Sequence, residues 1–244
     1  MRYAVFSDIH ANYEALKSCI KEMEKLDIGA YIFCGDLIGY GPQPAECAAE
    51  IRKLKNAHIV LGNHDAALVG KIDIKWFNEA AARAIEYSAR ALDGETLSWL
   101  SSLPERIDTP DFTMVHGTPR NALKEYLLSE SQFFDNLEYV SNPVCFIGHS
   151  HMPMYFSLRE GGRVFSDFIK PLEKLLINSQ KCFINPGSIG QPRDGNPLAS
   201  FGVYDSERKT FELIRVKYDV LTVQELMSKI GMPALLVERL AMGF

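Results

Sequence analysis

Residues 3–10 read Tyr-Ala-Val-Phe-Ser-Asp-Ile-His, a short apolar run that ends in two residues able to bind a metal, Asp8 and His10. The run is short and rich in aromatic and β-branched residues, so it predicts a buried strand. In open α/β sheets, ligands bind beyond the carboxyl ends of the strands. This stretch therefore predicts both a sheet and a site at its edge.

The same pattern recurs four times further along the chain. Apolar runs at residues 31–34, 59–61, 112–115 and 144–147 are followed by Gly35-Asp36, Gly62-Asn63-His64-Asp65, His116-Gly117 and Gly148-His149-Ser150-His151. Each fragment alone could be an ordinary turn or a core histidine, because such residues are common in both. Five of the six histidines, however, directly follow a predicted strand. We therefore expect the five loops to converge on one site.

The rest of the chain predicts how the strands are connected. Helices are expected after an N-cap at Asn12 and after the prolines at 42 and 44, and strands that alternate with helices indicate parallel pairing. A helix-rich segment at about 70–105 is expected to be an insertion. Beyond Met154 the alternation is typical of antiparallel strands, which predicts a second sheet from the second half. The whole chain, residues 1–244, is expected to form a single α/β domain.

Two short helices are expected at the end of the chain. The first is predicted to begin with a capping box at Thr222 and Glu225 and to stop at Gly231. The second is predicted to begin with Pro233 at its first helical position.

Composition narrows the class of protein. With 47% hydrophobic and 23% charged residues, the chain is an ordinary globular protein, and its net charge of -5 makes bulk nucleic-acid binding an unfavoured function. Five cysteines without a Cys-x-x-Cys pair are expected to be reduced core residues. No leader or membrane-spanning stretch is evident, so we expect a cytoplasmic protein with no membrane partner.

The candidate ligands have a mixed nitrogen and oxygen chemistry without thiolates. They are two carboxylates, one amide and four histidines: Asp8, His10, Asp36, Asn63, His116, His149 and His151. This set suits borderline divalent ions and exceeds the needs of one tetrahedral ion. It can fill two sites roughly 3.5 to 4 Å apart if one carboxylate, which we assign as Asp36, bridges them. Such a metal pair is suited to the hydrolysis of phosphate esters.

Taken together, these motifs closely resemble the calcineurin-like metallophosphoesterase family, whose pattern is D-x-H, G-D, G-N-H-[DE], H and G-H-x-H. The match spans Asp8 to His151. Residues 35–42, 116–120 and 185–193 are similar to a compact prokaryotic branch described as diadenosine-tetraphosphatase-like. The resemblance then covers nearly the whole chain.

The resemblance implies a fold and a role for each motif residue. The fold would be a four-layer α/β/β/α sandwich of two mixed β-sheets flanked by helices. Asp8, His10 and His151 would hold one ion. Asn63, His116 and His149 would hold the other, and Asp36 would bridge the two. His64 would protonate the leaving group.

The expected activity is hydrolysis of phosphomonoesters or nucleotide phosphoanhydrides by a metal-bridging hydroxide. Manganese is the first expectation for the two ions, with iron, zinc, nickel and cobalt as alternatives. A phosphodiesterase or nuclease of the same family stays open, as does a Ser/Thr protein phosphatase that acts on a phosphoprotein. Protein phosphatases of the family carry Asp and Arg where this chain has Gly39 and Tyr40. A scaffold without activity would be expected to have lost ligands, and none is lost here.

The substrate, a small phosphate ester or a nucleotide, also needs residues that bind its phosphate. Asn12, Arg120 and Arg193 are candidates because each lies just beyond a predicted strand and within a motif-like loop. The sequence predicts no oligomeric state.

Overall fold

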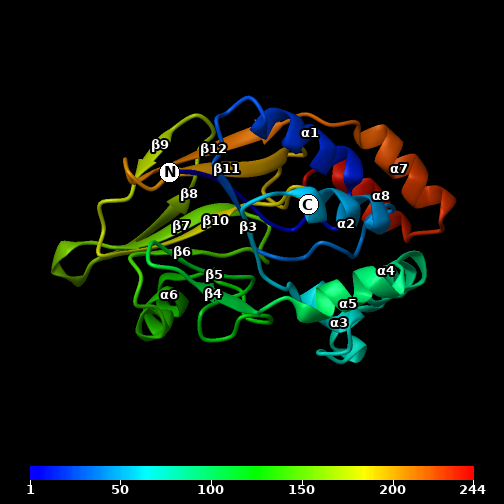
Figure 1. The fold of residues 1–244 in the computed structure, drawn as a ribbon, viewed down its shortest axis with the longest axis horizontal. Coiled ribbons are helices and arrows are strands. Elements are labelled where there is room, and N and C mark those ends of the chain that lie inside the picture. The colour runs from blue at the N-terminus through cyan, green and yellow to red at the C-terminus, as the bar shows by residue number, and fades with distance from the viewer.

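The computed structural model describes residues 1–244, and its strands form two six-stranded sheets (Figure 1). The order in the first sheet is β3 (Ala57–Ile59), β2 (Ala30–Phe33), β1 (Arg2–Phe6), β11 (Ala199–Asp205), β12 (Thr210–Val216) and β9 (Lys174–Leu176). Strands β1, β2 and β3 pair in parallel. Strands β11, β12 and β9 pair antiparallel, so this sheet is mixed.

The second sheet is mixed as well. Its order is β4 (Arg106–Asp108), β5 (Thr113–Val115), β6 (Val144–Phe146), β10 (Lys181–Pro186), β7 (Pro153–Leu158) and β8 (Val164–Phe168). The three central strands β5, β6 and β10 are parallel, and the outer ones are antiparallel to their neighbours. The carboxyl ends of β5, β6 and β10 therefore open on one edge of the sheet.

Helices cover the outer faces of both sheets. The α-helices are α1 (Tyr13–Met23), α2 (Pro44–Lys53), α3 (Asn63–Leu68), α4 (Glu79–Ala91), α5 (Gly94–Ser102), α6 (Glu130–Asn136), α7 (Val220–Lys229) and α8 (Ala234–Glu238). Single 3-10 turns are η1 (Ile74–Trp76), η2 (Leu137–Tyr139), η3 (Glu160–Gly162) and η4 (Arg239–Ala241). Figure 1 shows α1 and α7 outside the first sheet and α6 outside the second. The predicted α/β/β/α sandwich is confirmed.

The apolar core has a layer between the sheets and layers under the helices. Val5 and Ile32 of the first sheet pack with Phe146 of the second, because alternate side chains of each strand point into the space between the sheets. On the outer faces, Leu16 of α1 packs in the layer over the first sheet, and Phe133 of α6 packs over the second. All five cysteines are buried free thiols, as expected from their spacing.

The second half of the chain supplies β7, β8 and β10 to the second sheet, as predicted, but it shares that sheet with earlier strands and also adds strands to the first sheet. Strands β11 and β12 return to the first sheet, where Tyr204 pairs with Tyr3. Strands β4, β5 and β6 precede Met154 and belong to the second sheet. Backbone pairing between distant strands decides the sheet, and the alternation of side chains within one strand does not encode it.

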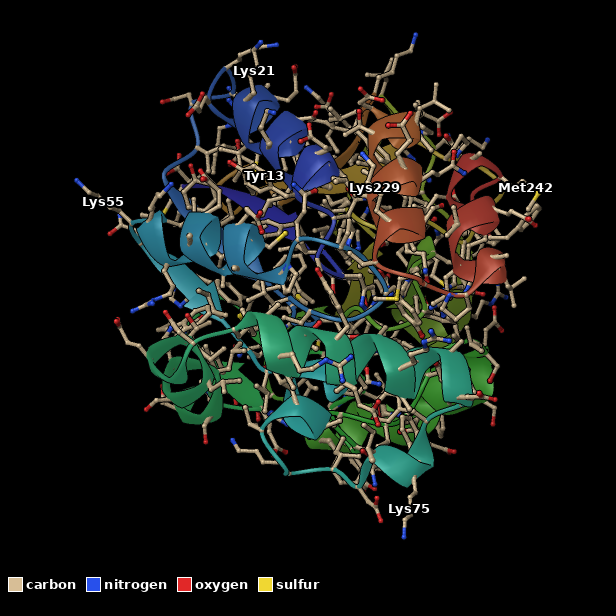
Figure 2. All side chains as sticks on the ribbon, turned by 90° about the vertical axis from the view of Figure 1, so that its right-hand side faces the viewer. Tyr13, Lys21, Lys55, Lys75, Lys229 and Met242 are labelled. Carbon is tan, nitrogen blue, oxygen red and sulfur yellow. The ribbon has the colours of Figure 1, made fainter.

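The helices at the end of the chain pack against α4. Ala84 of α4 packs with Val223 and Met227 of α7, and Figure 2 shows these helices together at one end of the molecule. The N-cap of α7 is Asp219, whose side chain accepts from the backbone nitrogen of Thr222 at 3.0 Å, so the predicted capping box was wrong. No helix in the structure has the length and apolar character that crossing a bilayer requires.

Candidate metal centre

The five predicted loops converge on one buried site. Residues that follow β1, β2 and β3 of the first sheet meet residues that follow β5 and β6 of the second. The Nε2 atom of His151 lies 3.3 Å from Oδ1 of Asp8, and Nε2 of His116 lies 3.4 Å from Oδ2 of Asp36. All seven candidate ligands and His64 are at most 4% exposed. The structure therefore brings together every residue that the motifs singled out.

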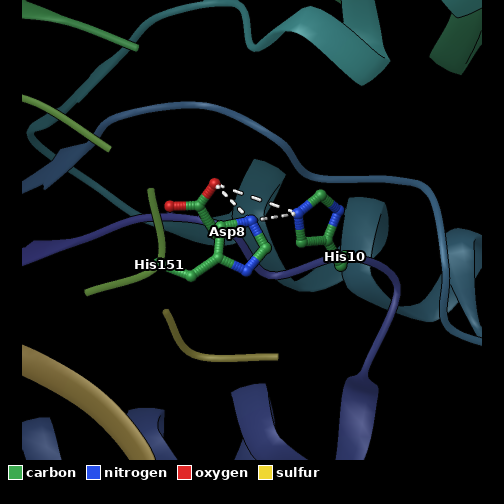
Figure 3. Close-up of side chains that lie close together, drawn as sticks. All are labelled: Asp8, His10 and His151. Carbon is green, nitrogen blue, oxygen red and sulfur yellow. Dashed lines mark hydrogen bonds and ion pairs between the residues drawn. The ribbon is translucent and has the colours of Figure 1, made fainter. Parts of the chain in front are cut away.

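One donor group consists of Asp8, His10 and His151 (Figure 3). The Nε2 atoms of His10 and His151 are 3.0 Å apart, and Nε2 of His10 is 3.8 Å from Oδ1 of Asp8. The Nδ1 atom of His10 is 2.9 Å from the carbonyl of Ile38, and Nδ1 of His151 is 2.6 Å from that of Gln191. Because a carbonyl only accepts, each Nδ1 must carry the proton.

These contacts point the lone pairs of two neutral imidazoles at each other. Burial lowers the pKa of His10 and of His151 well below the ordinary value, so neither Nε2 is expected to hold a proton. Two acceptors at 3.0 Å repel unless a cation lies beside them. Histidine ligands in metal sites are held in this way, with the other ring nitrogen donating to a carbonyl. This group therefore fits a divalent ion.

The other donor group consists of Asp36, His116 and His149. The Nε2 atom of His116 is 2.8 Å from Oδ1 of Asn63 and 3.2 Å from Nδ1 of His149. The Nδ1 atom of His116 again lies against a carbonyl, that of Cys34, at 2.8 Å. His149 presents Nδ1 instead of Nε2 to its neighbours. The Tyr126 ring stacks on the His149 imidazole with a centroid separation of 3.8 Å.

Asp36 lies between the two groups. Its Oδ2 atom is 3.6 Å from Nε2 of His10 and 3.4 Å from Nε2 of His116, so a single oxygen faces one histidine of each group. Its other oxygen, Oδ1, accepts the backbone N–H of His64 at 2.9 Å, which fixes the orientation of the carboxylate. This is the geometry that a bridging ligand requires.

The charges of the site are arranged around Asp36. Burial raises the pKa of Asp8 to about 7. Burial also acts to raise the pKa of Asp36, but the charges of His116 and His64 outweigh it and hold that pKa well below its usual range. Burial acts to lower the pKa of His116, yet the charge of Asp36 raises it to about 9. Negative potential is thus concentrated at Asp36, where it favours a cation.

The backbone of the site is held in an unfavourable conformation. Positive φ angles occur at five of the site residues, namely Asp8 (55°), His10 (47°), Asp36 (62°), His149 (69°) and His151 (60°). Residues other than glycine rarely adopt this left-handed region, which costs on the order of 1 kcal/mol or more per residue. Such strain persists only where the surrounding fold imposes it, and it is most common at functional sites.

Asp65 lies at the site, although no role is predicted for it from the sequence. Its carboxylate accepts hydrogen bonds from the backbone nitrogens of Gly62, Asp36, Leu37 and Ile38, at 3.0 to 3.1 Å. These bonds tie the loop after β2 to the start of α3. A Cβ on Gly62 would overlap the backbone of Asp36, so the approach of the two loops requires glycine. The only signal in the sequence was the place of Asp65 in the third motif.

His64 lies beside both donor groups. It forms a possible ligand group with His10 and Asp36, and burial lowers its pKa to about 4. Its Nδ1 atom is buried and has no hydrogen-bond partner. Tyr40 and Phe77 pack against the imidazole, with ring centroids 4.7 and 4.9 Å away. Nothing in the sequence pattern pointed to Phe77 or to Tyr126 as neighbours of the site.

Of the three candidate phosphate-binding residues, Arg193 lies beside the centre. It follows β10, whose carboxyl end opens on the same edge as that of β6. Its guanidinium lies 5.7 Å from the centroid of the Tyr40 ring, and Nη2 donates to Oε1 of Gln191 at 2.8 Å. Burial first, and then the charge of Arg193, lower the pKa of His151. The cation is therefore close enough to act on the site.

The other two candidates, Asn12 and Arg120, already have partners within the protein. Asn12 caps α1, because its Oδ1 accepts from Ala15 N at 3.1 Å and its Nδ2 donates to Gly190 O at 2.9 Å. Arg120 forms ion pairs with Glu125 and Asp135 near the surface. The Asn12 amide already uses its oxygen and its nitrogen, and the Arg120 guanidinium is already paired with two carboxylates. Both side chains therefore have little hydrogen-bonding capacity left for a phosphate.

The comparisons with known proteins agree with this geometry. Residues 1–209 match the calcineurin-like phosphoesterase superfamily domain. An uncharacterised protein of Methanocaldococcus jannaschii is 36% identical over 248 residues, an alignment that covers 98% of this chain and 97% of that protein.

Two solved structures have a similar fold. A metallophosphoesterase from Sphaerobacter thermophilus has a TM-score of 0.89 and 35% identity, with 100% of this chain and 99% of that chain covered. A hypothetical protein from Pyrococcus horikoshii has a TM-score of 0.83 and 20% identity over 100% and 98% of the two chains, which shows the fold alone. From its matched residues and these relatives, the chain belongs to the calcineurin-like phosphoesterase superfamily.

Proposed function

We propose that this protein is a phosphatase that uses two divalent ions to hydrolyse phosphomonoesters or nucleotide phosphoanhydrides. The observation that carries the proposal is the position of Asp36 Oδ2, which lies 3.6 Å from one histidine donor and 3.4 Å from another in a different group. A single ion needs no such shared carboxylate, whereas a pair of ions is commonly bridged by one.

The residues divide into two ligand sets around that carboxylate. Asp8, His10 and His151 form one set. Asn63, His116 and His149 form the other. When bound, two divalent ions at these positions supply a nucleophile from water near neutral pH and neutralise charge on the phosphoryl group. The ligand chemistry favours manganese first and allows iron, zinc, nickel or cobalt, because cellular availability also decides which metal is bound.

His64 is suited to hold the proton that the leaving oxygen requires. Its Nδ1 atom is enclosed by the protein, so Nε2 is the nitrogen left for a substrate. The backbone bond from His64 N to Asp36 Oδ1 at 2.9 Å places the imidazole next to the bridging position. A histidine in such a position can contribute general acid catalysis.

Arg193 is suited to bind the phosphate. Its side chain is anchored by Gln191 and by the face of the Tyr40 ring, so the guanidinium is held beside the centre before a substrate arrives. The Nε atom of Arg193 is buried without a partner. Arginine pairs with phosphate through a planar fork of donors, and a fork that is already ordered loses little entropy on binding.

The surroundings of His64 argue against a protein phosphatase. In those enzymes an Asp at the place of Gly39 contacts the catalytic histidine. Here a Cβ on Gly39 would overlap Nδ1 of His64, and the glycine has a φ of 93°. An aspartate side chain therefore does not fit without a rearrangement of the loop.

The helical insertion and the last helices of the chain are suited to limit which substrates enter. Tyr87 of α4 donates its hydroxyl proton to the carbonyl of Pro42 at 3.0 Å, next to Tyr40 in the loop that carries Asp36. Tyr40 also packs beside the cluster formed by α4, α7 and α8. We treat residues of about 70–105 as an insertion within a single domain, and its deletion should change the substrate profile.

The experiment is a measurement of bound metal together with an activity screen, with and without chelator. The panel contains p-nitrophenyl phosphate, its bis ester, dinucleoside polyphosphates and phosphopeptides. We expect about two ions per chain and chelator-sensitive hydrolysis of monoesters or anhydrides. Preference for the bis ester would favour a phosphodiesterase. Chelator-resistant hydrolysis, or unchanged activity in the Asp36→Ala and His64→Ala variants, would contradict the mechanism.

A further inference from the structure

The imidazole of His64 has no hydrogen-bond acceptor to orient it. Its Nδ1 atom is buried without a partner, although a catalytic histidine is usually oriented by a carboxylate or carbonyl at the second ring nitrogen. A Cβ at Gly39 would overlap Nδ1 of His64, so residue 39 has no room for a side chain that could supply such an acceptor. Another feature of the structure must therefore hold the ring at one χ2 angle, since this torsion has a broad energy profile.

Three rings surround the imidazole instead. The ring of Phe77 lies 4.9 Å away at an interplanar angle of 67°, and that of Tyr40 lies 4.7 Å away at 57°. The ring of His10 completes the enclosure at 4.9 Å and 75°. Edge-to-face and tilted contacts of this kind are favourable and depend on ring orientation. Rotation of the His64 ring would break them.

Phe77 is the member of this enclosure that has no other role at the site. His10 is a candidate ligand, and Tyr40 supports Arg193. Phe77 directly follows η1 in the insertion, and its backbone nitrogen donates to Ile74 O at 3.0 Å. The ring of Trp76 also packs against Phe77, with centroids 5.0 Å apart. The side chain of Phe77 is thus a contact between the insertion and His64.

We propose that Phe77 is a positioning residue, which holds the His64 imidazole so that its Nε2 atom faces the leaving oxygen of the substrate. Packing against an aromatic ring takes the place of the acceptor that is missing at Gly39. This inference rests on the proposed function, because it assigns a support to the proton donor of that reaction. It also gives the insertion a role in catalysis.

The test compares two aryl phosphates that differ in their need for a proton. The phenol released from p-nitrophenyl phosphate is a good leaving group, and the one released from phenyl phosphate is a poor one. In the Phe77→Ala and Phe77→Leu variants, kcat for phenyl phosphate should fall about tenfold, while kcat for p-nitrophenyl phosphate stays within about twofold. KM and bound metal should not change. Phe77→Tyr, which keeps the ring, should restore the wild-type ratio.

Two further variants distinguish a positioning role of Phe77 from a general loss of activity. Lys75→Ala changes a side chain of the same segment that points into solvent in Figure 2, and it should behave as the wild type. His64→Ala should lose activity with both substrates, and the loss should be larger for phenyl phosphate than for p-nitrophenyl phosphate. A wild-type protein without chelator-sensitive hydrolysis would refute the proposed function itself. If the wild type is active and the Phe77 variants lose both substrates equally, or neither, the positioning role is overturned.

Discussion

The carboxylate of Asp65 accepts the backbone N–H of Asp36 at 3.0 Å, so the residue that we propose as the bridge is held by an acidic residue that belongs to neither donor group. Three more backbone nitrogens donate to the same carboxylate, at 3.1 Å each. Hydrogen bonds to a buried charged group are strong, and their loss leaves backbone donors without partners. Asp65 is therefore a main determinant of the loop geometry at the metal centre.

The substitution Asp65→Asn tests this role. The amide nitrogen would face backbone N–H groups that need acceptors, so we expect the free energy of unfolding to fall by about 2 to 4 kcal/mol and metal binding to weaken. Denaturant unfolding and metal analysis measure the two effects. Asp73→Asn is the control, because Asp73 is exposed and accepts a single backbone bond, from Lys75 at 2.9 Å. Equal stability of the two variants would show that Asp65 is not needed.

The strands next to the site could be predicted from the sequence, whereas their arrangement in the two sheets could not. Strand β6 is buried throughout and β1 is buried from Tyr3 to Phe6, and both are short apolar runs next to polar residues, which is a local signal. Strands β4 and β9 have three residues each and are partly exposed, so they lack that signal. The pairing of Tyr3 with Tyr204 joins the two ends of the chain, and no local pattern encodes such a contact.

The candidate ligands could be predicted from the sequence for a related reason. Histidines that follow strands are unusual enough to form a pattern, and the parallel strands bring them together. Phe77 and Tyr126 reach the centre from loops with no such pattern, and only the fold shows their contacts with His64 and His149. Asn12 lies just beyond β1, where the sequence alone does not separate a phosphate-binding asparagine from the N-cap of a helix.

The two arginines of the phosphate-binding candidates give a matched pair of variants. Arg193→Ala removes the cation anchored on Tyr40, and kcat/KM should fall about 10- to 100-fold. Arg120→Ala breaks ion pairs at the surface and should stay within about twofold of the wild type. Steady-state kinetics with the best substrate of the screen measures both effects. A larger loss in Arg120→Ala than in Arg193→Ala would reverse the assignment.

Asn12→Ala separates a structural role from a role in binding. The variant removes the N-cap of α1 and leaves Gly190 O without its donor, so the free energy of unfolding should fall by about 2 kcal/mol. KM at a temperature where the protein is folded should stay within about twofold of the wild type. The measurements are thermal or denaturant unfolding and steady-state kinetics. A stable variant with a large increase in KM would restore Asn12 as a phosphate-binding residue.

The buried His64 should make the metal-free protein sensitive to acid. Its pKa is about 4 in the folded protein against an ordinary value of 6.5, so the unfolded chain binds the proton more readily. Stability is then fully present above pH 6.5 and is lost as the pH falls from 6.5 toward 4, by on the order of 3 kcal/mol. Asp8 opposes this trend, because a carboxyl whose folded-state pKa is raised to about 7 makes the folded protein more stable as the pH falls.

The comparison must therefore be between the chelator-treated wild type and His64→Gln, which retains Asp8. Between pH 7 and 4 the wild type should lose about 3 kcal/mol more than the variant in denaturant unfolding. Parallel stability curves would show that His64 remains accessible to protons in the folded state.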